Sequence, residues 1–438
     1  MIALALVAAA AIDAAALAQT TATLNALGPH AFGSPRNRAA AQFVGAKLQD
    51  AGLAETTVED FEFEGAAGTN VVARIPGRSD RLLILATHHD TLKDATDVTG
   101  RSRTLATLIE LGRQAARLRP SRTWILASFD GGESRGEGFA RYLESLGSSR
   151  SLIDGVLILD AAPAGSVGSD PVVMAPACPG PGGGAGRSIA GADLITAALA
   201  GLPEEPPVSF DDPGISLMTQ PFLRAFRTRC DPLAARALAV GAEALTIGEI
   251  PFSRTALASP AAPASNEAAK RDEAGARLGN AAFQAFFGID SAALPPARAD
   301  SWLVVGRTVL SGWLIFLTGL AALLPGLFAA RGDMKRLAIR LAYSALFGVF
   351  LFQEPEVGLF TGLLPSLVPA AWSRRALLVS FLPTALLVTA GALSWARGQV
   401  TGSWLSPWLW GCLAAALLIL FVTQGGKKGP ARARRGKK

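Results

Sequence analysis

The chain contains few of the residues that build disulfide frameworks and imidazole-rich metal sites. Its 438 residues include three cysteines and three histidines, and no histidine follows residue 89. Three cysteines exclude a disulfide-stapled scaffold. Cys178 and Cys230 either form one disulfide in an oxidising compartment or are two buried thiols. Any metal-binding histidine in this chain therefore has few imidazole partners.

Outside its last twelve residues, the chain also lacks a net excess of basic residues. Lys427–Lys438 carries seven basic residues and no acidic one, so subtracting 7 from the net charge of +6 leaves −1 for the rest. A nucleic-acid-binding protein needs a basic face on its folded domain. We therefore expect no nucleic-acid partner, and we interpret residues 425–438 as a basic cytoplasmic tail that lies against membrane lipid.

Long uncharged apolar runs begin near residue 301 and indicate a transmembrane region over residues 301–424. The basic residues gather at one end of these runs and the acidic ones at the other, which predicts a cytoplasmic tail and an extracytoplasmic N-terminal domain. No acidic residue lies deep within a run, which argues against an ion pathway. About five membrane helices are expected, at Val309–Ala330, Leu337–Phe352, Val357–Trp372, Ala376–Trp395 and Trp404–Val422.

The first 18 residues are rich in Ala, Leu and Val and end in Ala16-Leu17-Ala18. This pattern predicts a signal peptide that is cleaved after Ala18, or an uncleaved N-terminal anchor. No Lys or Arg precedes the apolar stretch, and Asp13 interrupts it, so the sequence leaves both alternatives open. Residues 19–290 are then one soluble domain, and residues 291–300 link it to the membrane region.

Three short apolar runs in the soluble domain predict buried parallel strands. They are separated by helix-like segments, so the predicted fold is α/β, a mainly parallel sheet flanked by helices. The runs are Leu82–Thr87, Trp124–Phe129 and Val156–Leu159. Further expected elements are the helices Arg38–Ala51, Thr104–Leu118 and Gly138–Leu146 and the strands Asn70–Ile75 and Ala244–Ile250.

Each of the three runs leads to a side chain that binds metals in other proteins. His88 follows the first run, Glu133 lies four residues after the second, and Asp160 follows the third. Loops at the carboxyl ends of parallel strands meet in one crevice. An imidazole and two carboxylates at three such ends therefore outline a metal site.

Five segments together resemble the di-zinc aminopeptidase family of metallopeptidases, in the same order and spacing over most of Thr20–Asp290. This family includes aminopeptidase Y, the glutaminyl cyclases and several inactive relatives. The resemblance implies a zinc-exopeptidase-like fold in which two Zn²⁺ ions and a free glutamate activate water to hydrolyse a bond. The segments are Leu27–Ser34 (LGPHAFGS), Thr69–Ala73 (TNVVA), Thr87–Thr91 (THHDT), Phe129–Glu133 (FDGGE) and Leu157–Asp160 (LILD).

Four positions match family roles. By this resemblance His88 is the first metal ligand, Asp90 is the neighbour that orients its ring, Glu133 is the second glutamate, and Asp160 is the strand-end aspartate. In an alignment without gaps, the aspartate that bridges the two metal ions in the family corresponds to Gly100. Asp97, three residues earlier, takes this role only if the loop is rearranged.

Other positions depart from the family pattern. The catalytic glutamate is replaced by Gly132, and Glu133 is a base only if the register shifts by one residue, which puts Ser134 at a ligand position. The family has a further histidine ligand late in its chain. The corresponding segment here is Ala258–Ala262, which has alanine at both functional positions. Arg254 nearby offers a guanidinium in place of a metal cation.

These departures imply zero or one zinc ion rather than two, with a single ion held by His88, Asp97 and Asp160. They favour a non-catalytic domain that binds a peptide or protein partner or assembles a complex. One alternative is an active membrane-bound zinc aminopeptidase. Another is a transamidase-like subunit, because the domain order resembles the aminopeptidase-like subunit of the GPI transamidase.

Overall fold

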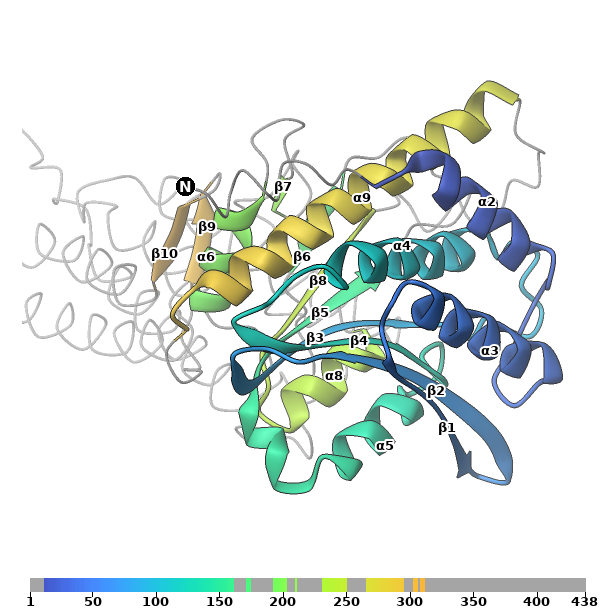
Figure 1. Cartoon of the computed structure of the whole chain (residues 1–438), viewed down its shortest axis with the longest axis horizontal. Coiled ribbons are helices and arrows are strands. Elements are labelled where there is room, and N and C mark those ends of the chain that lie inside the picture. Colours follow the sequence, from blue (N-terminus) through green and yellow to red (C-terminus); the bar gives the residue numbers. More distant parts are fainter. Residues whose placement is uncertain are drawn as a thin grey trace, which may run out of the picture. The chain divides into compact units, whose positions relative to one another are not determined.

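A mixed sheet of eight strands organises the part of the chain that the computed structural model describes, residues 12–160, 171–174, 192–202, 209–210, 231–249, 265–294, 302–305 and 308–311 (Figure 1). The helices are α2 (Ala14–Asn25), α3 (Pro35–Asp50), α4 (Thr99–Ala115), α5 (Glu137–Ser145), the 3₁₀ helix η1 (Gly147–Leu152), α6 (Ala192–Gly201), α8 (Pro232–Ala239) and α9 (Ser265–Ser291). The strands are β1 (Glu55–Phe63), β2 (Ala66–Ile75), β3 (Ser79–His88), β4 (Arg122–Phe129), β5 (Ile153–Asp160), β6 (Pro171–Met174), β7 (Ser209–Phe210), β8 (Ala244–Glu249), β9 (Trp302–Val305) and β10 (Thr308–Ser311).

The strand order is β1-β2-β4-β3-β5-β8-β6-β7. The four central strands, β4, β3, β5 and β8, are parallel, as the sequence predicted. The edges differ from a mainly parallel sheet, because β1 is antiparallel to β2, β2 to β4, and β6 to β8. The turn between β1 and β2 is only Glu64 and Gly65, both with positive φ, and so short a connection permits only antiparallel pairing.

Helices cover both faces of the sheet. On one side lie α2, α3, α4, α6 and α9, and on the other lie α5 and α8 (Figure 1). Every residue of β4 is buried, as expected for a strand with helices on both faces. The predicted strands and helices of the domain all appear, with ends shifted by a few residues.

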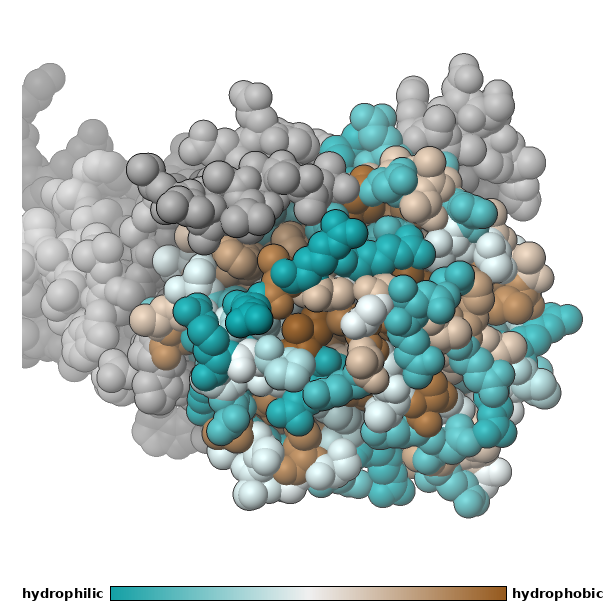
Figure 2. Space-filling view, viewed as in Figure 1, coloured by the Kyte–Doolittle hydropathy of each residue, from teal (hydrophilic) through white to brown (hydrophobic). Residues whose placement is uncertain are grey.

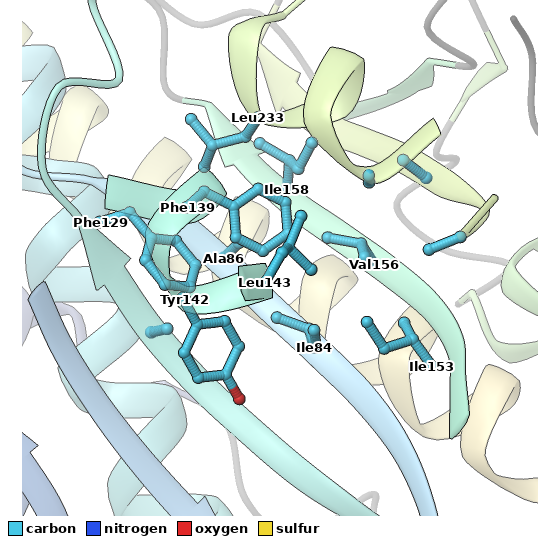
Figure 3. Packing of buried hydrophobic residues seen from close by; sticks show 14 of the residues in the cluster. Ile84, Ala86, Phe129, Phe139, Tyr142, Leu143, Ile153, Val156, Ile158 and Leu233 are labelled. Carbon is cyan, nitrogen blue, oxygen red and sulfur yellow. The ribbon is translucent and has the colours of Figure 1, made fainter. Parts of the chain in front are cut away.

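Aromatic rings fill the core beneath α5. The ring centroid of Phe129 lies 4.7 Å from that of Phe139 and 5.3 Å from that of Tyr142, and Leu233 of α8 and Ile158 of β5 close the same cluster (Figure 3). On the opposite face Trp124 packs edge-on against two phenylalanines of α9. Apolar side chains therefore pack on both faces of the central strands.

The C-terminal end of α9 is fixed to the start of β4 by Arg122. Its guanidinium donates to the carbonyl oxygens of Ile289, Asp290 and Ala292 at the end of the helix, where carbonyl groups lack the donors of a following helical turn. In return the Asp290 carboxylate accepts the backbone N–H groups of Ser121 and Arg122 at 2.8 Å. This reciprocal contact fixes the end of α9 against the start of β4.

The first described residues belong to the folded domain. Asp13, which interrupts the apolar stretch, is the N-cap of α2 and accepts the N–H groups of Ala15 and Ala16. Leu17 is completely buried, and the Ile12 N–H donates to Asn280 of α9 at 2.9 Å. The cleavage point expected after Ala18 therefore lies inside a packed helix, and the domain begins before residue 19.

Among the described residues, no helix combines the length and apolar character needed to cross a bilayer. The predicted spans lie outside these residues, except that Val309–Ser311 is part of strand β10. Strands β9 and β10 form a separate two-stranded sheet.

The described surface exposes few large apolar side chains. Hydrophilic residues cover most of the described face in Figure 2, and apolar residues appear there as small separate patches. The exposed large apolar residues in the described part are Val58, Leu92 and Val240.

Leu17→Ala tests whether α2 is part of the fold. Truncating this buried side chain leaves a cavity against α4 and α9, so we expect the free energy of unfolding to fall by about 2–5 kcal/mol. Urea unfolding of the full-length protein in detergent measures the change, and Gln19→Ala, an exposed site on the same helix, is the control. Equal stabilities of both variants and the parent would show that α2 contributes nothing to the domain.

Candidate functional site

The carboxyl ends of β3, β4 and β5 lie side by side at one edge of the sheet. His88 of β3 pairs with Phe129 of β4, and Ala86 pairs with Ile158 of β5. Because Asp160 follows Ile158 by two residues, it lies level with His88. The sheet therefore brings the three predicted strand ends to one edge.

Asp90 connects the loop after β3 with the loop after β4. Its carboxylate is buried, lies 3.0 Å from His88 Nδ1, and accepts the N–H groups of Gly132 at 2.7 Å and Glu133 at 3.0 Å. Burial alone raises the pKa of Asp90, but the charge of His88 and the hydrogen bonds from His88 and Glu133 outweigh it and hold the pKa well below its usual range. An ionised Asp90 therefore orients the His88 ring, the role that the resemblance gives it.

Gly132 packs directly against the His88 ring. A Cβ at this position would lie 2.2 Å from His88 Cγ and 2.3 Å from His88 Cβ, far inside van der Waals contact. The loop around it turns at Gly131 and Gly136, whose φ values of +70° and +67° suit glycine. Since the resemblance puts the catalytic glutamate at position 132, the present loop and ring leave no space for that side chain.

Glu133 faces a guanidinium. Its Oε1 accepts a hydrogen bond from Arg101 Nη2 at 3.0 Å, and the Arg101 side chain is 12% exposed while that of Glu133 is 33% exposed. Arg101 lies in the first turn of α4. Sequence reasoning missed Arg101, because no local signal distinguishes it from Arg103 two residues later. Its contact with a loop 32 residues away arises from the fold.

Asp97 is exposed and acts at the start of α4. Its Oδ1 accepts the Thr99 N–H at 2.9 Å, next to the N-cap residue Val98, whose side chain makes no capping hydrogen bond. This use of an aspartate is common at helix starts and satisfies a backbone donor.

Asp231 is a carboxylate near His88 and Asp160 that sequence reasoning also missed. Burial raises its pKa, the negative charge of Asp160 raises it further, and His88 opposes the shift. Asp231 caps α8 by accepting the N–H groups of Leu233 and Ala234. The pair Asp231-Pro232 is a recognisable helix-start signal, but it does not predict the approach to His88.

His30 is buried beside the same loops. Its Nδ1 lies 2.6 Å from the Gly28 carbonyl oxygen, and its backbone exchanges hydrogen bonds with Thr91 after β3. Burial lowers the pKa of His30; the Gly28 carbonyl raises it, and His89 and Arg101 add to the lowering. His30 is therefore neutral at pH 7.

His89 and Asp130 have structural partners. His89 is completely buried with Nδ1 2.9 Å from Ser128 Oγ, so it packs in the core instead of facing solvent. Asp130 accepts the N–H groups of Gly131 and Thr69 and the side-chain amide of Asn37. These bonds fix the loop that carries Gly132 and Glu133.

The predicted ligands do not fit a zinc centre as a set. In the part of the chain that the structure describes, no three His, Cys, Asp or Glu side chains come together in a way that could hold a metal ion. His88 and Asp160 lie at one edge, but Glu133 is paired with Arg101 and Asp97 is bonded at a helix start. The single-ion set of His88, Asp97 and Asp160 is thus not assembled. Arg254, the segment Ala258–Ala262, Cys178 and Cys230 lie outside the described residues.

No protein-family model and no curated protein matches the chain. Solved structures with a similar fold include an aminopeptidase from Aneurinibacillus sp. strain AM-1, with 14% identity, a TM-score of 0.42, and coverage of 63% of this chain and 94% of that chain. The zinc aminopeptidase BSAP from Bacillus subtilis has 9% identity and a TM-score of 0.44, covering 62% and 95%. A glutaminyl cyclase from an Acidobacteriales bacterium has 18% identity and a TM-score of 0.42, covering 64% and 96%. These neighbours are of the kind that the sequence motifs predicted, but likeness at this level assigns no activity.

Acid should destabilise the domain through His30. Unfolded histidine takes up a proton below about pH 6.5, whereas folded His30 resists protonation, so the free energy of unfolding should fall as the pH drops from 7.5 to 5. His30→Asn keeps a donor for the Gly28 carbonyl and removes the titration. We expect this variant to reduce the pH slope, measured by urea unfolding, by up to one proton. An unchanged slope would assign the acid sensitivity to other groups.

Proposed function

We propose that this chain is a non-hydrolytic relative of the di-zinc aminopeptidases that binds a peptide or protein partner at the carboxyl edge of its sheet. The contact between Gly132 and His88 is the observation that carries this proposal. In the aminopeptidase pattern, a glutamate at position 132 takes a proton from the attacking water. Glycine has no such group, and the His88 ring occupies the space that a larger side chain would need.

The neighbouring carboxylate is a poor substitute for the base. Glu133 already accepts a charge-assisted hydrogen bond from Arg101, which engages one of its oxygens. A missing general base typically lowers a rate by about 10²–10⁴-fold. Loss of the base together with an unassembled ligand set therefore favours binding over hydrolysis.

Arg101 supplies a positive charge beside Glu133, to which the resemblance gives the role of a metal ligand. A guanidinium donates hydrogen bonds in fixed directions and stays protonated, but it does not generate a hydroxide nucleophile as zinc does. Polar groups of a bound partner can therefore be held at this site while the attacking water stays unactivated.

An apolar residue lies in the loop that follows β3. Leu92 is 62% exposed, directly after Thr91 and before α4. An exposed apolar side chain close to hydrogen-bonding groups suits a binding site, where apolar contacts supply affinity and polar groups fix orientation. This combination supports a peptide as the ligand.

The proposal includes a membrane location. The apolar runs over residues 301–424 support an integral membrane protein with the N-terminal domain outside the cytoplasm and the basic tail inside, in contact with anionic lipid. A partner would then meet the domain on the extracytoplasmic side.

Metal analysis and a peptidase assay test the loss of catalysis. We expect the full-length protein, purified in detergent without chelator, to contain no stoichiometric zinc, to keep its urea midpoint in EDTA, and to release no p-nitroaniline from leucine p-nitroanilide above the His88→Ala background. The physical reason is that the base is missing and Glu133 is already paired. Stoichiometric zinc, together with hydrolysis that His88→Ala abolishes, would establish the active aminopeptidase instead.

Leu92→Asp tests the position of the binding surface. If Leu92 is buried by a bound peptide, its loss should weaken binding by about 10–100-fold, because burying a leucine side chain contributes roughly 1.5–3 kcal/mol. Fluorescence polarisation with a pool of random hexapeptides, labelled on a lysine side chain so that both termini are free, measures the affinity. Val58→Asp is the control, since this exposed residue of β1 lies three strands from β3. Equal affinities of the two variants would place peptide binding elsewhere.

A further inference from the structure

Two nitrogens of Arg101 are buried and have no hydrogen-bond partner among the residues that the structure describes. Nη2 donates to Glu133, whereas Nε and Nη1 are shielded from solvent and donate to no atom of that part of the chain. A buried donor without a partner is costly, and more so on a charged group. Native proteins contain few such groups, and an unrecorded water, ion or ligand is a common explanation.

The position of Arg101 in its helix points to an anion. Arg101 lies in the first turn of α4, and this turn contains no acidic residue. The positive end of the helix dipole disfavours a cation there and favours a negative charge. Glu133 provides one such charge from another loop, but it engages only Nη2.

The neighbouring side chains that the structure describes do not bond the remaining donors of Arg101. His30 is close enough for the charge of Arg101 to lower its pKa, but its Nδ1 faces the Gly28 carbonyl and its Nε2 has no hydrogen-bond partner. Asp90 is already engaged by His88 and by the N–H groups of Gly132 and Glu133. None of these groups bonds the free N–H groups of Arg101.

Two further acidic side chains of the site belong to β5 and α8. Asp160 ends β5 and Asp231 caps α8, and the charge of Asp160 acts on Asp231. Arg101 lies in the first turn of α4, where it contacts the Glu133 carboxylate. An anionic group of a ligand is expected at Arg101.

We propose that Arg101 binds a carboxylate of the peptide ligand through the N–H groups that Glu133 leaves free. This inference rests on the proposed peptide binding and specifies its chemistry. Arginine and carboxylate form strong, directional, charge-assisted hydrogen bonds, and a peptide offers a carboxylate either at its C-terminus or on an acidic side chain.

Three blocked tripeptides test this proposal by isothermal titration with the full-length protein in detergent. Acetyl-Ala-Ala-Leu has a C-terminal carboxylate, acetyl-Ala-Ala-Leu-amide has none, and acetyl-Ala-Glu-Leu-amide has only a side-chain carboxylate. We expect at least one carboxylate peptide to bind about tenfold or more tightly than the uncharged amide, because hydrogen bonds to charged groups contribute more than neutral ones. Which one binds identifies the source of the carboxylate.

Variants test whether Arg101 causes the preference for carboxylate peptides over the amide peptide. Arg101→Met should remove the difference between the carboxylate and amide peptides, and Arg101→Lys, which keeps the charge but loses the planar fork, should retain part of it. Glu133→Gln should strengthen carboxylate binding severalfold, because it removes a competing negative charge, and a folding defect would not produce this gain. Arg141→Met, at an exposed arginine of α5 that pairs with Glu144, should change nothing.

The outcomes separate the two proposals. Equal binding of all three peptides, or a carboxylate preference that survives in Arg101→Met, would overturn the carboxylate site and leave peptide binding intact. No binding of any peptide to the parent protein would overturn both proposals.

Discussion

The buried carboxylate of Asp90 is the interaction on which the site depends. It joins two loops that are separated by more than 40 residues, because it faces His88 Nδ1 and accepts the N–H groups of Gly132 and Glu133. These bonds place Gly132 against the His88 ring and bring Glu133 within reach of Arg101. The close contact between Gly132 and the His88 ring therefore follows from one ionised, buried aspartate.

Charge at this site is balanced by protein groups. Arg101 forms an ion pair with Glu133, and His88 Nδ1 lies 3.0 Å from Asp90 Oδ1. Asp97 accepts a backbone N–H at the start of α4. Each carboxylate that resembles a metal ligand or its neighbour is thus employed in a different bond, apart from Asp160, whose charge acts on Asp231.

Stability comes from elsewhere in the domain. Apolar side chains pack on both faces of the sheet, with Phe129, Phe139 and Tyr142 on one face and Trp124 against α9 on the other. Helix α2 adds Leu17 and Leu24 to the second face, and Arg122 ties the end of α9 to β4. Apart from Phe129, which ends β4 beside His88, these contacts lie away from the strand-end residues of the site.

The sequence by itself determined the parallel core strands, the helices between them, and the order of His88, Glu133 and Asp160 at strand ends, because apolar runs and helical spacing are local patterns. The resemblance also puts Gly132 at the position of the family's catalytic glutamate, which remains a prediction. Only the tertiary structure decided that α2 belongs to the domain, that the sheet edges are antiparallel, and that Arg101 meets Glu133 while Asp231 approaches His88. Those contacts join residues far apart in the chain, and their distances depend on how whole helices and loops pack, which no local pattern records.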